Sequence, residues 1–316
     1  MTIGVAWIRQ GTDSEELWLA SDSRISGDGH IWDDCPKLFS LPRRDTVIGF
    51  SGSTGQAYPL LLQLTNAVGS YRAAADGTLE FYRLTSHLAR VANSMMNRLV
   101  IDPAISGDKP NYREFATTGD NLVIAGYSRR RDRLVVRVLK YSKTVDKWNF
   151  EHFRPAPALG GGRLIATFGD RPAKSRYGYV LRRLLEGRSM LRSNLAFNFE
   201  PLEALAEFLK MPESNARPLP ANCRPATVGG APQVMRILTG AQATAFAVGW
   251  ELAGNQGVYL QGRLTFDYER LDVPLVTFDD SRPRIHAPGQ WPTDGSAASI
   301  ETMAVNTDGG ESELTD

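Results

Sequence analysis

TIGVAWIRQGTDSEELWLASDSR, residues 2–24, is the stretch that decides the fold. Residues 3–9 and 17–22 within it are apolar runs, and a polar segment separates them. Two such runs joined by a polar connection predict an antiparallel hairpin. The next two apolar runs, KLFSL (37–41) and TVIGFSG (46–52), predict a second strand pair.

The rest of the chain alternates between groups of strands and pairs of helices. Apolar residues at helical spacing predict helices at 53–75, 79–100, 171–187 and 200–211. Further strands are expected at 121–128, 133–142, 148–154, 163–169, 233–238, 244–252 and 257–271. This order is not the strict β-α-β alternation of a doubly wound parallel sheet. It predicts an α+β fold, a four-layer αββα sandwich in which two antiparallel sheets stack face to face and a helix pair flanks each.

Composition and charge argue against several classes of protein. The 316 residues include 36 Lys or Arg and 35 Asp or Glu, so the formal net charge is +1. This balance argues against a protein that binds nucleic acid by neutralising phosphates. No apolar run approaches the ~18 residues of a membrane span, and the N-terminus lacks the basic and apolar regions of a signal peptide. We therefore expect no nucleic-acid partner and no membrane association.

The cysteines and histidines bear on compartment and cofactors. Cys35 and Cys223 are the two cysteines of the chain, which suits a reducing compartment. The four histidines lack the spacing of a zinc site. We therefore expect a cytoplasmic protein that needs no metal and no organic cofactor.

The composition changes toward the C-terminus. From Pro283 the chain is rich in Pro, Gly, Ser, Thr and acidic residues. We expect a main domain in residues 1–262, a C-terminal extension with a strand in 263–288, and a disordered acidic tail in 289–316.

Thr2 carries a nucleophilic group at the start of the chain. A small residue after the initiator Met1 permits removal of that methionine, and Thr2 would then present both a hydroxyl and a free α-amine. An α-amine titrates near pH ~8, so it can act as a general base at neutral pH. A threonine paired with its own amine is an activated nucleophile. Very many proteins begin Met-Thr, so this pattern alone does not indicate a nucleophile. The surrounding residues decide whether Thr2 is interpreted as one.

Four segments occur in order within the first 57 residues: TIGVA, LWLASDSR, CPKLF and IGFSGSTGQA. Together they resemble the proteasome β-subunit and HslV-type threonine peptidases, which are N-terminal nucleophile (Ntn) hydrolases. In that family a threonine opens the first strand and a small residue follows four positions later, as Ala6 follows Thr2. The second strand ends in Asp-Ser-Arg, as it does at 22–24. The resemblance fades after about residue 70.

The resemblance implies catalytic roles for four residues. Thr2 is the nucleophile, Lys37 is a nearby ammonium that helps to move the hydroxyl proton, and Asp22 orients Lys37 by an ion pair. The backbone N–H of Gly52 forms the oxyanion hole. Without the resemblance, Asp22 is interpreted as a turn cap, Lys37 as a solvated surface lysine and Gly52 as a residue that permits a tight turn.

The resemblance also implies contacts with substrate. Ser26 matches the position that holds a peptide in extended, strand-like pairing. Phe50 matches the base of the pocket for the side chain before the scissile bond, and Cys35 and Thr54 line that pocket. A phenylalanine base would favour small side chains, although Phe50 equally suits simple core packing.

Three later positions are possible supporting residues. Gly169 and Asp170 lie where the family has a glycine followed by a serine, so Asp170 replaces that serine. The proteasome branch also has an Asp and a Ser before a glycine pair. In the matching segment RPATVGG, Pro225 and Val228 stand at those two positions. The nearby Thr227 is expected to substitute in part for the missing Asp and Ser.

The expected function is therefore that of a threonine-type endopeptidase that hydrolyses peptides or unfolded proteins within a self-compartmentalised homo-oligomeric ring. The sequence does not show whether an ATPase unfoldase feeds it. Two alternatives stay open: a non-catalytic scaffold or binding subunit of the same fold, and an amidase acting on small molecules. The missing Asp and Ser at 225–228 favour the scaffold modestly.

Overall fold

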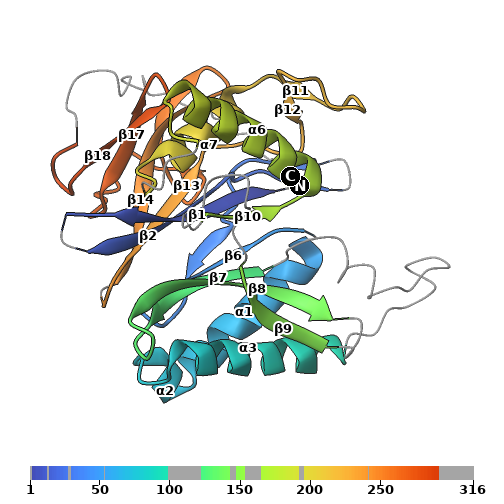
Figure 1. The fold of residues 1–316 in the computed structure, drawn as a ribbon, viewed down its shortest axis with the longest axis vertical. Helices are drawn as coiled ribbons and strands as arrows, with labels where there is room; N and C mark the ends of the chain where they lie inside the picture. The colour runs from blue at the N-terminus through green and yellow to red at the C-terminus, as the bar shows by residue number, and fades with distance from the viewer. Residues whose placement is uncertain are drawn as a thin grey trace, which may run out of the picture.

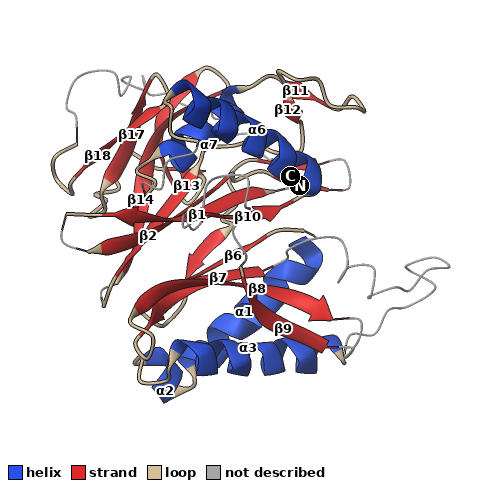
Figure 2. Ribbon diagram, in the orientation of Figure 1, coloured by secondary structure: helices blue, strands red, loops and turns tan. Residues whose placement is uncertain are grey.

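The fold is mixed α+β, and its sheets are mostly antiparallel (Figures 1 and 2). The structure is a computed structural model. It describes residues 2–12, 14–27, 30–52, 54–98, 122–142, 147–153, 165–191, 196–240 and 242–291. Most of the predicted acidic tail, residues 292–316, lies outside these ranges.

The larger sheet contains the predicted N-terminal hairpin at its centre. Its order is β10-β1-β2-β13-β14-β15-β16, and β17 and β18 are attached beside β14. The strands are β1 (Ile3–Gln10), β2 (Glu15–Ser21), β10 (Ile165–Gly169), β13 (Gln233–Leu238), β14 (Ala243–Leu252), β15 (Asn255–Leu260), β16 (Arg263–Leu264), β17 (Leu275–Asp279) and β18 (Arg282–His286). The hairpin prediction is confirmed, because β1 and β2 pair antiparallel with Trp7 opposite Trp18.

The smaller sheet is antiparallel throughout, in the order β5-β6-β7-β8-β9. Its strands are β5 (Leu38–Ser40), β6 (Thr46–Phe50), β7 (Leu122–Ser128), β8 (Arg133–Ser142) and β9 (Lys147–His152). Two short pairs lie outside the large sheets: β3 (Ile25–Gly27) with β4 (His30–Trp32), and β11 (Glu213–Ser214) with β12 (Arg224–Pro225). These short pairs were not predicted, because their segments are polar and short.

The helices lie largely where the apolar spacing predicts them. They are α1 (Thr54–Gly69), α2 (Arg72–Ala75), α3 (Phe81–Met96), α6 (Arg171–Gly187) and α7 (Glu200–Lys210). The single helix predicted over 53–75 is wrong, because the chain turns after Gly69 and α2 is a separate short helix. Ser53, its predicted first residue, lies outside the described residues.

Three groups of buried apolar side chains hold the elements together. One lies between α6, α7 and the larger sheet and includes Trp7 and Trp18. A second lies between α1, α3 and the smaller sheet and includes Phe81. The third joins the two sheets and includes Ala6 of β1 and Leu38 of β5. Figure 1 shows each helix pair on the side of its sheet that faces away from the other sheet.

The C-terminal part of the chain extends the larger sheet. β17 pairs in parallel with β14, so part of the predicted extension is bonded directly to the sheet of the main domain. The single strand predicted over 257–271 is wrong: β15 ends at Leu260, and the chain turns through Gln261 and Gly262, whose φ angles are 54° and 87°. Among the helices of the described segments, none has the length and apolarity needed to cross a membrane.

Candidate active site

Thr2 lies at the entrance to β1, between β2 and β10. Its side chain is on the face of the larger sheet that looks toward the smaller sheet, because it follows the alternation of Gly4 and Ala6. Gly4 is required on that face, since a Cβ there would lie 2.1 Å from the ring of Phe168. Thr2 is 3% exposed. The fold therefore places the threonine hydroxyl in the interior between the sheets.

Asp22 and Lys37 form a buried ion pair beside the first peptide of β1. Lys37 Nζ is 2.8 Å from Asp22 Oδ1, and the two side chains are 1% and 0% exposed. The same carboxylate accepts hydrogen bonds from the backbone nitrogens of Ile3 (3.0 Å, to Oδ1) and Gly229 (3.2 Å, to Oδ2). Buried charges need such partners. The alternative of a solvated surface lysine is therefore wrong, and Asp22 does more than cap a turn.

Gln233, the first residue of β13, holds the segment that carries Lys37. Its buried side-chain Oε1 accepts hydrogen bonds from the backbone nitrogens of Lys37 (2.9 Å) and Leu38 (3.2 Å). Its Nε2 donates to the carbonyl of Cys35 (2.7 Å). We did not predict this role. The one sequence signal was a glutamine at the head of an otherwise apolar strand.

Asp170 contacts Thr2 directly. Its carboxylate Oδ2 accepts a hydrogen bond from the backbone nitrogen of Thr2 at 2.5 Å, and its own nitrogen donates to the Thr2 carbonyl at 3.0 Å. Asp170 is the N-cap of α6 but makes no side-chain capping bond to that helix. Its carboxylate is thus directed to the nitrogen that would become an α-amine if Met1 were removed.

Gly169 allows this close approach. Its φ is 116°, and a Cβ at this position would lie 2.0 Å from the Thr2 carbonyl oxygen. The glycine is therefore required both by backbone conformation and by space. Both predicted supporting residues of this segment, Gly169 and Asp170, are in contact with Thr2.

The glycine pair near residue 230 packs against the end of β2. The carbonyl of Gly229 accepts hydrogen bonds from the nitrogens of Ser23 (3.1 Å) and Arg24 (2.9 Å). A Cβ at Gly230 would lie 2.2 Å from Ser23 Oγ. Thr227, two residues before Gly229, has a buried Oγ1 with no hydrogen-bond partner among the described residues. The loop therefore reaches Asp22 through the backbone of Gly229, whereas the Thr227 hydroxyl forms no hydrogen bond with any described residue.

Arg24 ties this loop to the β3–β4 region. Its guanidinium forms two hydrogen bonds with the carboxylate of Asp33 (2.6 and 2.9 Å), and its Nη1 donates to Glu213 (2.6 Å) and to the carbonyl of Ala226 (2.7 Å). The hydrogen bonds to Asp33 and then to Glu213, with the negative charges of both carboxylates, raise the pKa of Arg24. The cation is thus fixed in place as a structural anchor.

Gly52 lies just beyond the end of β6, and Thr54 begins α1. The neighbouring Phe50 nitrogen donates to the Lys37 carbonyl (3.1 Å), so this strand end runs beside the Lys37 segment. The φ of Gly52 is 98°, which requires glycine. The tight-turn interpretation of Gly52 is therefore confirmed, and its role as an oxyanion donor stays a prediction.

Phe50 and Cys35, which are predicted to line a substrate pocket, are both buried. Phe50 is 1% exposed and packs on Tyr58, with ring centroids 5.0 Å apart. The Tyr58 hydroxyl donates to the carbonyl of Pro36 (3.1 Å). Burial raises the pKa of the Cys35 thiol. The core-packing interpretation of Phe50 is confirmed, and its part in a substrate pocket stays a prediction.

Ser26 lies in β3, in a small hairpin that leads away from Arg24. It pairs with Ile31 of β4 and is partly exposed. Ile31 and Trp32 of the same hairpin are 58% and 66% exposed. The position suits contact with another molecule, and the predicted peptide contact of Ser26 remains a prediction.

No protein-family model matches the chain, and no curated protein matches it significantly. In the described ranges, no group of three or more His, Cys, Asp or Glu side chains is arranged to hold a metal ion. The geometry around Thr2 is therefore the main support for a function.

Proposed function

We propose that the protein is an Ntn hydrolase that cleaves peptide bonds with Thr2 as its nucleophile. The observation that carries this proposal is the buried Asp22–Lys37 pair beside Thr2. Lys37 Nζ and the Ile3 nitrogen bond the same carboxylate oxygen, so the ammonium lies next to the Thr2–Ile3 peptide. The two sheets with helices on their outer faces support the further proposal that this is the four-layer Ntn sandwich.

The proposed reaction begins with removal of Met1, which frees the Thr2 amine. The neutral amine takes the proton of the Thr2 hydroxyl, directly or through water, as the oxygen attacks the peptide carbonyl carbon. The Gly52 N–H stabilises the oxyanion, and the Lys37 ammonium adds positive charge at the site. The C–N bond of the substrate then breaks, and its nitrogen leaves with the proton held by the amine.

The products of that step are a free amine and an ester on Thr2. Water hydrolyses the ester, and the Thr2 amine again serves as the base. In this scheme Asp170 orients the amine through the contact seen at the Thr2 nitrogen. Asp22, Gln233 and the Gly229 backbone keep Lys37 in place, so they are positioning groups.

The test is cleavage of fluorogenic peptides and of an unfolded protein by the purified chain. We expect Thr2→Ala to lower kcat by more than about 10³-fold, since it removes the nucleophile. Thr12→Ala, in the exposed turn of the same hairpin, is the matched control and is expected to keep full activity. Equal rates for Thr2→Ala and the unchanged protein would reject the proposal.

The proposal includes a homo-oligomer. Ile31 and Trp32 on the β3–β4 hairpin and Leu62 on α1 are exposed apolar side chains that a neighbouring copy would cover. Size-exclusion chromatography with light scattering should give a multiple of the chain mass. A monomer at micromolar concentration would rule out a homo-oligomeric ring that encloses the active sites. The proposed peptide hydrolysis would still be tested by the cleavage assay.

One observation favours the scaffold alternative. Pro225 and Val228 offer no side-chain oxygen or nitrogen near the Gly229 loop, where the proteasome branch has an Asp and a Ser. A chain that is oligomeric but inert toward every peptide, and toward a threonine-reactive lactone, would support that alternative.

A further inference from the structure

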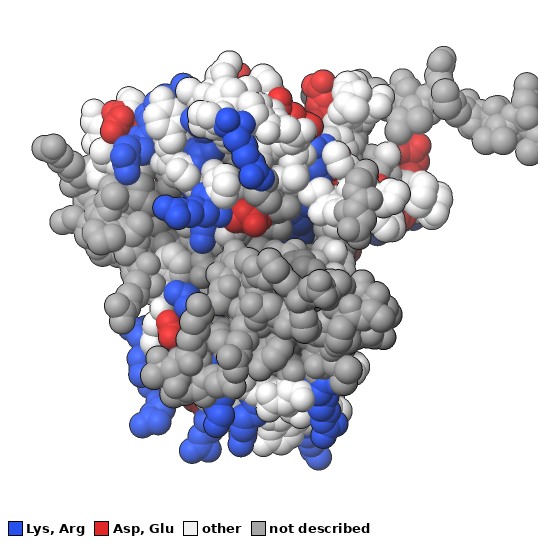
Figure 3. All heavy atoms as spheres, turned by 90° about the vertical axis from the view of Figure 1, so that its right-hand side faces the viewer, with Lys and Arg blue, Asp and Glu red and all other residues white. Residues whose placement is uncertain are grey.

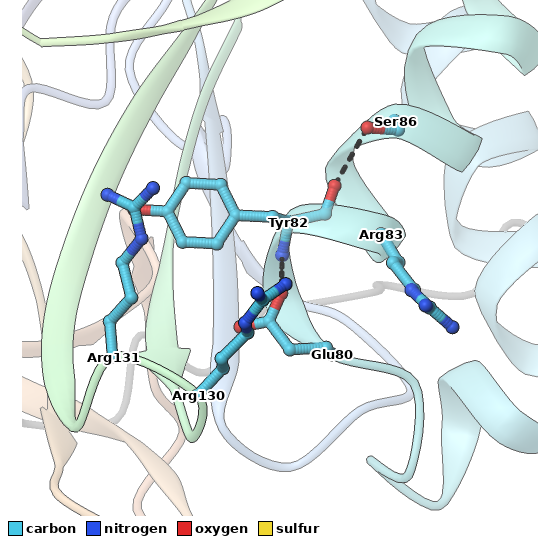
Figure 4. A pocket seen from close by; sticks show the side chains of 6 residues that line it. All are labelled: Glu80, Tyr82, Arg83, Ser86, Arg130 and Arg131. Atoms are coloured by element: carbon cyan, nitrogen blue, oxygen red, sulfur yellow. Dashed lines mark hydrogen bonds between the residues drawn. The ribbon is translucent and has the colours of Figure 1, made fainter.

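A cavity at the far end of β7 from Phe50 is lined by arginines. It has a volume of ≈ 560 Å³ and lies between the first turn of α3 and the turn that joins β7 to β8 (Figure 4). Its lining residues are Glu80, Tyr82, Arg83, Ser86, Arg130 and Arg131. Leu122, at the other end of β7, pairs with Phe50 near the candidate active site. The cavity is therefore separate from that site.

The charge of this cavity is unbalanced. Three arginines line it against one carboxylate, and none of the three forms an ion pair with any residue that the structure describes. The carboxylate of Glu80 is already engaged: it accepts hydrogen bonds from the Tyr82 nitrogen (2.6 Å) and the Ser128 hydroxyl (2.5 Å). Figure 3 shows basic side chains also gathered at the lower end of the molecule, where α3 lies. The described lining therefore carries more positive than negative charge, three guanidiniums against one carboxylate.

Tyr82 adds a buried polar group without a partner. Its hydroxyl is buried and has no hydrogen-bond partner among the described residues. Two guanidiniums lie near its ring, with the carbon of Arg131 4.4 Å and that of Arg137 5.2 Å from the ring centroid. Figure 4 shows the Tyr82 side chain extending from α3 toward Arg131. A buried hydroxyl that bonds none of the described residues is a place where a water or a ligand would supply the missing partner, once a neighbouring side chain moves aside.

We propose that this cavity binds the phosphate group of a small phosphorylated ligand. Arginine guanidiniums match phosphate oxygens with paired N–H donors. The first turn of α3, a helix of 16 residues, lies at the same place, but Glu80 already caps its Tyr82 N–H, so the arginines are the main anion-binding groups. The volume is in the range of ~300–1,000 Å³ that holds a small organic ligand. This inference does not depend on the proposed hydrolase activity.

His152 reports on the charge of the cavity. Its ring lies 5.3 Å from that of Tyr82. Burial, and then the charges of Arg137, Arg131 and Arg133, lower the pKa of His152. A bound phosphate or sulfate would offset those positive charges and raise the pKa of His152. By reciprocity the anion binds more tightly at a pH where His152 is protonated.

The test is a proton NMR titration of the four histidines with and without sulfate. Sulfate mimics a phosphate dianion and keeps its charge from pH 5 to 8, and sodium chloride holds the ionic strength constant. The His152 signal is assigned with His152→Gln. We expect a saturable upward shift of the His152 pKa, whereas His286, on β18 of the other sheet, does not shift.

Calorimetry with inorganic phosphate at pH 7 gives the affinity. Replacing both Arg130 and Arg131 with glutamine is expected to weaken binding at least ~10-fold, or about 1.4 kcal/mol. Arg90→Gln is the matched control, because Arg90 is exposed on α3 but does not line the cavity. Absence of saturation, an equal shift at His286, or an equal loss in Arg90→Gln would overturn the proposal.

A nucleoside monophosphate distinguishes two forms of recognition. Binding that is tighter than for inorganic phosphate supports the proposal and shows that the rest of the cavity contacts the ligand. Equal binding also supports it and restricts recognition to the phosphate group. Loss of phosphate binding at 150 mM salt in the unchanged protein would overturn it, since a mere surface attraction is screened in that way.

Discussion

Replacing Lys37 with methionine removes one partner of a completely buried ion pair. The change deletes the Nζ that lies 2.8 Å from Asp22 Oδ1 and leaves a carboxylate with 0% exposure. Two backbone donors, from Ile3 and Gly229, remain on that carboxylate. Breaking a buried pair from one side costs about 3–5 kcal/mol, because an uncompensated charge stays in the interior. We expect a loss of unfolding free energy in this range.

Urea unfolding followed by tryptophan fluorescence measures the loss. Trp7 and Trp18 are buried, so unfolding exposes them. An unchanged m value would show that the variant alters stability and not the surface exposed on unfolding. Arg284→Met is the control, because its ion pair with Asp279 has side chains 66% and 64% exposed. Exposed pairs contribute about 0–1 kcal/mol, so an equally small loss in Lys37→Met would show that the buried pair stabilises the protein no more than an exposed one.

The double variant separates the pair from its surroundings. In Lys37→Met combined with Asp22→Asn both charges are absent, so no buried charge remains unpaired. The loss of unfolding free energy should then be smaller than the sum of the two single losses. An additive result would show that the two side chains do not stabilise each other.

Two further variants probe the contacts of Thr2. Gly169→Ala should lose at least about 2 kcal/mol more unfolding free energy than Gly254→Ala. Both glycines have positive φ (116° and 83°), but a Cβ meets the Thr2 carbonyl at Gly169 and nothing within 4 Å at Gly254. Equal losses in urea unfolding would contradict this. Asp170→Asn should move the pH dependence of Thr2 acylation to lower pH, since it removes the carboxylate that favours the protonated amine. An unchanged profile in stopped-flow acylation would show that Asp170 does not act on the amine.

The hairpin and most helices were predictable because their signals are local. Residues 3–9 and 17–22 pair as expected, and α6 spans the predicted 171–187. The break after Gly69 and the turn at Gln261–Gly262 were missed. Apolar residues continue on both sides of each break, so periodicity alone does not reveal the change in backbone direction.

The candidate site was predictable only in part. The resemblance brought Thr2, Asp22 and Lys37 together as a set, and the structure places the last two in direct contact. Gln233 was missed because it bonds a segment 196 positions away in the chain. The carboxylate of Asp170 looked like a departure from the family pattern. Its contact with the Thr2 nitrogen becomes evident only when β10 and β1 are paired.

The most direct test of the central claim is an intact-mass spectrum of the untagged protein after exposure to a threonine-reactive β-lactone. We expect a main species that lacks one methionine and carries one lactone adduct, and we expect Thr2→Ala to gain no adduct. A protein that keeps Met1 and gains no adduct would contradict the claim that Thr2 is a working nucleophile.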